Sequence, residues 1–89
     1  MKHPIDIANY DGSLEDLARE IATLRYDKLA EFLCDLSDCI EADGKADTAR
    51  GYVQLGEILH QLSMKIDSAE FGTWEAWGIC KKHMRDNNG

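Results

Sequence analysis

The clearest helical pattern in the chain is YVQLGEILHQLSMKI, which covers residues 52–66. Its apolar residues recur at intervals of three and four, so on a helix they form one continuous stripe. This spacing predicts a helix that begins near Ala46 or Asp47 and ends near Ile66. The stripe consists of Tyr52, Leu55, Ile58, Leu59, Leu62 and Ile66.

The preceding segment carries two further apolar stripes that do not align with each other. Ser13 followed by Glu15 and Asp16 predicts a helix start, because a serine hydroxyl caps the first turn and acidic side chains favour that end of the helix dipole. At about 100° per residue, the stripe after Tyr26 is displaced from the first by roughly 80–90°. We therefore expect a break near residues 25–27, where Asp27 would cap a new helix. The first stripe is Leu14, Leu17, Ala18, Ile21 and Leu24, and the second is Leu29, Phe32, Leu33, Leu36 and Ile40.

A chain reversal is predicted at residues 41–44, because Gly44 can adopt the left-handed conformation that ends many helices. Two helices joined by so short a loop must lie antiparallel. Gly51 and Gly56 inside the second helix each cost about 1 kcal/mol relative to alanine. Their presence indicates that a neighbouring helix, or the same helix of another subunit, approaches closely there.

The two ends complete the predicted fold. Residues 1–12 are expected to form an arm that packs Ile5, Ile7 and Tyr10 on the body, and residues 68–72 a connection to a last helix capped by Thr73. Residues 86–89 are expected to fray. The prediction is an all-α single domain over residues 1–89: a small three- to four-helix bundle built on an antiparallel helical hairpin, with a short N-terminal arm.

Charge restricts the classes of partner. The net charge is −7, and residues 1–47 carry twelve acids against five bases. A protein of this sign is repelled by phosphate backbones and anionic membranes, so we expect neither direct nucleic-acid binding nor membrane binding. The N-terminal residues lack the apolar run of a signal peptide, and this favours a cytoplasmic protein.

Five carboxylates share one face of the predicted helix over residues 26–40 and its extension, at spacings of four, four, three and three. We name this set the acidic row. It lies opposite the apolar stripe and is expected to face solvent, either as a solvated surface or as a docking surface for a basic protein partner. Its members are Asp27, Glu31, Asp35, Asp38 and Glu41.

Glu57 and His60 form a Glu-x-x-His pair, the spacing that supplies ligands in di-iron helical bundles. One copy does not complete such a site, so metal binding is an alternative hypothesis that needs a second copy, with Glu31 or Glu41 as bridging ligands. Cofactors are otherwise not expected. The cysteines, Cys34, Cys39 and Cys80, are expected to be reduced packing residues.

No arrangement of nucleophile, base and orienting group stands out, and we expect a protein that is not an enzyme. An aromatic cluster near the C-terminus is expected either to cover the core or to form an apolar interface, for example in a homodimer. The leading hypothesis is an acidic interaction module, an adaptor or an inhibitor such as phages and mobile elements encode. A structural subunit of a larger complex is a further alternative. The candidate interface is Phe71, Trp74, Trp77 and Met84.

Overall fold

The structure is a computed structural model that describes residues 3–88, with side chains from His3 to His83. It contains three helices: α1 (Leu14–Ala22), α2 (Tyr26–Ala49) and α3 (Val53–Asn88). The described residues include no β-strand, which confirms the predicted all-helical class. Within the same residues, none of the helices combines the length and apolar character needed to cross a bilayer.

α1 begins where the sequence predicts. The Ser13 hydroxyl accepts a hydrogen bond from the backbone N–H of Asp16 at 3.0 Å, and the Asp16 carboxylate accepts one from the N–H of Ser13 at 3.3 Å. This reciprocal pair satisfies two amides that the first turn leaves unbonded. The predicted break is also present, since α1 ends at Ala22 and α2 begins at Tyr26. Asp27 does not cap α2; Arg25 occupies the capping position and Asp27 lies in the first turn.

The reversal between α2 and α3 lies later than predicted. α2 continues through Gly44 to Ala49, and the chain turns at Gly51, whose φ of 96° is accessible to glycine at little cost. The prediction at residues 41–44 was wrong because Gly44 has a packing role. Gly44 is buried against α3, and a Cβ at its position would lie 3.1 Å from the carbonyl oxygen of Gly56.

α3 is one continuous helix where we expected two. Residues 68–72 are helical, and the hydroxyls of Ser68 and Thr73 donate to the carbonyl oxygens of Met64 and Ala69, four residues earlier. Thr73 therefore bonds back into the preceding turn instead of starting a new helix, a known alternative for threonine. The helix extends to Asn88, through most of the segment expected to fray; Gly89 lies outside the described residues.

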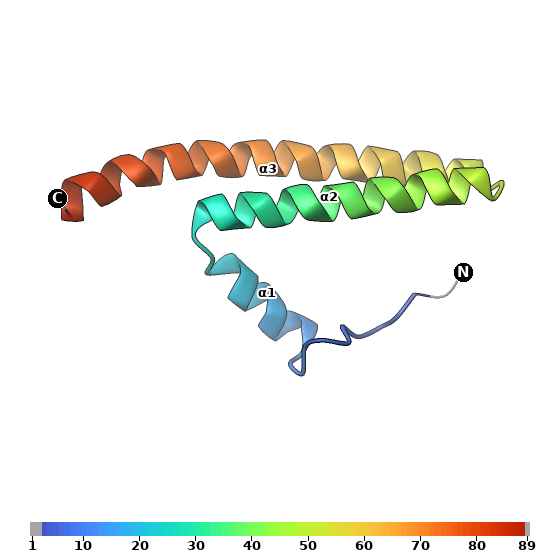
Figure 1. The fold of residues 1–89 in the computed structure, drawn as a ribbon, viewed down its shortest axis with the longest axis horizontal. Coiled ribbons are helices and arrows are strands. Elements are labelled where there is room, and N and C mark those ends of the chain that lie inside the picture. The colour runs from blue at the N-terminus through green and yellow to red at the C-terminus, as the bar shows by residue number, and fades with distance from the viewer. Residues whose placement is uncertain (1–2, 89) are drawn as a thin grey trace.

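Figure 1 shows α2 and α3 side by side and antiparallel, with α1 leaning away from both near the start of α2. The Cα extents are 56 × 29 × 14 Å, so the molecule is long and thin. Only α2 and α3 pack extensively among the described elements. The arm does not pack as predicted: Ile5 is 87% exposed, while the Tyr10 hydroxyl donates to Glu20 of α1 at 2.5 Å.

Small residues form the contact between α2 and α3. They recur at intervals of seven in each helix, which returns them to the same side. Because these side chains are short, the two backbones approach closely and the larger side chains remain beside the contact. We name this set the small-residue seam. It consists of Ala30, Ser37 and Gly44 from α2 and of Gly56 and Ser63 from α3, all buried.

Candidate functional site

The acidic row starts with two residues that form local ion pairs on α2. The Asp27 carboxylate accepts two hydrogen bonds from Arg25, at 2.7 and 2.8 Å, and these lower the pKa of Asp27. Glu31 lies 3.0 Å from the ammonium group of Lys28. The first half of the acidic row is therefore partly neutralised by its own helix.

Asp35 and Asp38 form the exposed centre of the acidic row. Both are solvent-exposed, and neither forms an ion pair or a side-chain hydrogen bond among the described residues. Glu41 differs, because it is turned toward α3 and its side chain is only 31% exposed. The surface available to a partner is thus narrower than the five-residue row in the sequence.

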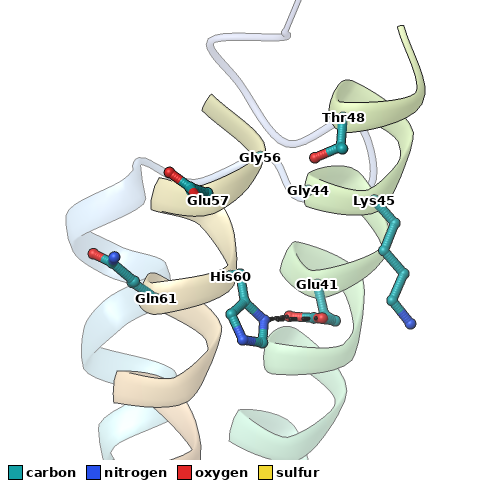
Figure 2. Close-up of a pocket in the computed structure, with 8 residues that line it drawn as sticks. All are labelled: Glu41, Gly44, Lys45, Thr48, Gly56, Glu57, His60 and Gln61. Atoms are coloured by element: carbon teal, nitrogen blue, oxygen red, sulfur yellow. Dashed lines mark hydrogen bonds and ion pairs between the residues drawn. The ribbon is translucent and has the colours of Figure 1, made fainter. Parts of the chain in front are cut away.

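Glu41 belongs to a polar groove between α2 and α3, close to the turn (Figure 2). Its carboxylate receives hydrogen bonds from the Ser63 hydroxyl at 2.7 Å and from Nδ1 of His60 at 2.8 Å. These two contacts lower the pKa of Glu41. The groove is open to solvent and has a volume of about 480 Å³. Its lining is Glu41, Gly44, Lys45, Thr48, Gly56, Glu57, His60 and Gln61.

A second polar contact crosses the hairpin one turn further along. The hydroxyl of Ser37, which is buried, lies 3.0 Å from the carbonyl oxygen of Ser63 and 2.5 Å from Oδ1 of Asp67. Within the described residues, no buried side-chain polar atom lacks a hydrogen-bond partner. The hydrogen bonds of Glu41, His60 and Ser63 and of Ser37 and Asp67 cross between the helices, and they fix the register of α2 against α3.

Glu57 and His60 both line the groove, but the His60 imidazole points toward Glu41 and not toward Glu57 (Figure 2). Among the described residues, no group of three or more His, Cys, Asp or Glu side chains is arranged to hold a metal ion. The metal hypothesis stays a prediction that requires ligands from a second copy of the chain.

The predicted aromatic cluster is divided by the structure. Trp77 is half-buried, with the Arg25 guanidinium 5.1 Å from the ring centroid, so it holds the start of α2 against α3. Phe71 is 72% exposed and Trp74 is 41% exposed, with the Trp74 indole N–H donating to Glu70 at 2.9 Å. The side chain of Met84 lies outside the described residues.

An apolar surface beside the small-residue seam was not predicted from the sequence. The predicted stripes of α2 and α3 are only partly buried between the two helices, and several of their members are exposed. The spacing of seven between Ala30, Ser37 and Gly44 was visible in the sequence and could have indicated a small-residue contact. The most exposed members of the two stripes are Phe32 (37%), Leu36 (37%), Tyr52 (53%), Ile58 (55%) and Leu62 (40%).

No protein-family model, curated protein or solved structure matches the chain. The surfaces described above are thus the basis for a functional assignment. They comprise an exposed acidic centre on α2, a groove in which Glu41 bonds to His60 and Ser63, and an uncovered apolar surface.

Proposed function

We propose that the protein is a non-enzymatic interaction module, an adaptor or an inhibitor, that docks the acidic row on the basic surface of a partner protein. The observation that carries this proposal is the state of Asp35 and Asp38, which are exposed on a regular helix without ion pairs among the described residues. The surrounding molecule reinforces their field, because the chain carries a net charge of −7.

The expected mechanism is electrostatic complementarity. A row of carboxylates on a rigid helix attracts a basic groove over several ångströms, raises the association rate and disfavours partners of the same sign. Such a row also competes for sites that hold phosphate groups. The partner we expect is therefore a basic protein, including one that handles nucleic acid, and not the nucleic acid itself.

The groove near the turn gives no comparable support for catalysis. The hydrogen bonds of Glu41 go to His60 and Ser63 and hold the hairpin together. A catalytic base needs a free lone pair directed at a substrate, and Glu41 uses both carboxylate oxygens within the hairpin.

The test is a charge reversal with a matched control. The double variant Asp35→Lys/Asp38→Lys should retain less partner in pull-downs from the native host's lysate, with affinity for the partner thus identified reduced by about tenfold or more at low salt. The control Glu57→Lys/Glu75→Lys changes the net charge equally through two exposed acids of α3. It should bind nearly as well as the unmodified protein.

Salt dependence provides the second measurement. Affinity for the partner should fall steeply as NaCl is raised, because screening weakens exposed charge pairs. Equal losses in the two double variants would show that only total charge matters. Unchanged binding in Asp35→Lys/Asp38→Lys, with far-ultraviolet circular dichroism showing intact helices, would exclude the acidic row as the docking surface.

A further inference from the structure

The isolated chain exposes more surface than a folded monomer of its size. Its accessible surface is 7063 Å², about 1,800 Å² above the roughly 5,240 Å² expected for a compact protein of 10.0 kDa. Ala30 is the only buried hydrophobic residue among the described side chains, and none of the large ones is fully buried. Ordering a chain costs about 1–2 kcal/mol per residue in backbone entropy alone, so a helical pair with this little burial needs a further contact.

Most of the exposed apolar residues of the two stripes lie on one side of the hairpin, whereas the exposed Met64 lies on the other. Each helix turns by about 100° per residue, so the angular position of a side chain around the helix axis can be compared with that of the small-residue seam. Leu36 on α2 and Leu62 on α3 are displaced from the seam in the same direction of rotation. The helices run in opposite directions (Figure 1). The same sense of rotation therefore places both residues on one side of the plane that contains the two axes. Glu41 and His60 are rotated in the other sense, in agreement with their hydrogen bond on the groove side. We name the first side the apolar face. It comprises Leu29, Phe32, Leu33, Leu36, Ile40, Leu55, Ile58, Leu59, Leu62 and Ile66.

The length of the apolar face argues against cover by α1 alone. Ser37 of α2 lies level with Ser63 of α3. From this level Leu55 lies about 12 Å toward the turn and Leu29 about 12 Å in the opposite direction, so the apolar face is about 24 Å long at 1.5 Å per residue. α1 has nine residues and spans about 14 Å. A second hairpin of the same length matches the whole face.

The distribution of charge favours a second copy. Asp35 and Asp38 lie on the side of α2 turned away from the apolar face. Two copies can therefore join face to face without bringing their acidic centres together. The excess surface of about 1,800 Å² per chain, to which the unpacked arm also contributes, falls in the range that obligate dimers bury, which is about 1,000–2,500 Å² per partner.

We propose that a second copy of this chain covers the apolar face, so that two hairpins form a four-helix homodimer with both acidic rows on its outer surface. This interface is distinct from the aromatic cluster at residues 71–84. It is also independent of the acidic row, so the docking proposal and the dimer proposal can fail separately.

The experiment measures the mass of the purified full chain by light scattering and sedimentation over a wide range of concentrations. We expect twice the chain mass of 10.0 kDa and a melting temperature that rises with protein concentration, because association then stabilises the fold. Leu62→Ala should raise the dimer dissociation constant by about tenfold or more. The matched control is Met64→Ala, since Met64 is also exposed on α3 but lies on the groove side.

Leu62→Ala removes only part of one side chain and should leave both helices folded. The Leu36→Asp/Leu62→Asp variant places two charges in the proposed interface and should give only monomer with reduced helical content. Asp35→Lys/Asp38→Lys should dimerise like the unmodified chain. A monomer at every concentration with a constant melting temperature would overturn the proposal, and a loss of stability on Leu17→Ala would then identify α1 as the cover. A dimer weakened equally by Leu62→Ala and Met64→Ala would also overturn it, because the interface would not be the apolar face.

Discussion

Gly44 and Gly56 set the distance between α2 and α3. A Cβ on Gly56 would lie 2.8 Å from the Gly44 carbonyl oxygen and still closer to the Thr48 hydroxyl. The hydroxyl can rotate, but the carbonyl belongs to a helix and cannot move without separating the backbones. Gly72, which has no atom within 4 Å of its Cβ position, lies in the same helix and provides a comparison.

Gly56→Ala should therefore destabilise the protein although alanine favours helix. The gain in helix propensity is about 0.8–1.0 kcal/mol, and overpacking costs about 1–3 kcal/mol, which leaves a net loss of about 1 kcal/mol. Gly72→Ala should instead raise the free energy of unfolding by up to about 1 kcal/mol. Urea denaturation at one fixed protein concentration measures both. Stabilisation by Gly56→Ala would show that the helices do not approach as closely as described.

Glu41 makes the stability of the hairpin dependent on pH. Hydrogen bonds from Ser63 and His60 lower its pKa in the folded state relative to the unfolded chain. The folded state therefore binds fewer protons, and this contribution to stability is complete above the ordinary glutamate value of about 4.3 and lost as the pH falls through the lower folded-state pKa. We expect the melting temperature to fall on acidification across that range.

Glu41→Gln should be less stable at neutral pH and should lose less stability on acidification. Part of the acid response will remain, because Arg25 also lowers the pKa of Asp27. Glu57→Gln is the control, since Glu57 lines the same groove and forms no side-chain hydrogen bond among the described residues. Parallel pH profiles for Glu41→Gln and the unmodified protein would contradict the role assigned to Glu41.

At the scale of elements, the sequence predicted the features that depend on neighbouring residues. The cap at Ser13 and the break before Tyr26 follow from local hydrogen bonding and from the displacement of the apolar stripe, and both are present. The predictions of a reversal at residues 41–44 and of a helix end near Ile66 were wrong. A glycine that ends a helix and a glycine that lets two helices touch have the same sequence signature, and only the position of α3 distinguishes them.

The candidate surfaces were predictable to a similar degree. The acidic row follows from spacing, and Asp35 and Asp38 are exposed as expected. Glu41 is drawn into the groove because His60 and Ser63 lie opposite it, 19 and 22 residues away in the chain, a distance that helical periodicity does not address. The apolar stripes predicted buried faces, but several of their members are exposed in the chain. A stripe does not specify whether its cover comes from the same chain.

At the scale of the whole molecule, charge is concentrated along a thin structure. The acidic half of the chain includes α2, and the 14 Å extent leaves little low-dielectric interior between its charges and solvent. Like charges three or four residues apart on a helix each cost a few tenths of a kcal/mol, and an unbalanced net charge adds general repulsion in the folded state. Because these groups are exposed, dissolved salt screens them effectively.

The melting temperature should consequently rise when NaCl is increased from about 0.01 M to about 0.5 M, as the Debye length falls from about 30 Å to below 8 Å. The rise should be smaller in Asp35→Asn/Asp38→Asn, which removes the exposed centre of the row and should itself be slightly more stable at low salt. Scanning calorimetry at constant protein concentration measures both effects. A melting temperature that falls with added NaCl would mean that ion pairs such as Arg25–Asp27 and His60–Glu41 outweigh the repulsion along α2. In that case the acidic row would already be balanced within the protein, and the basis for its docking on a basic partner would be removed.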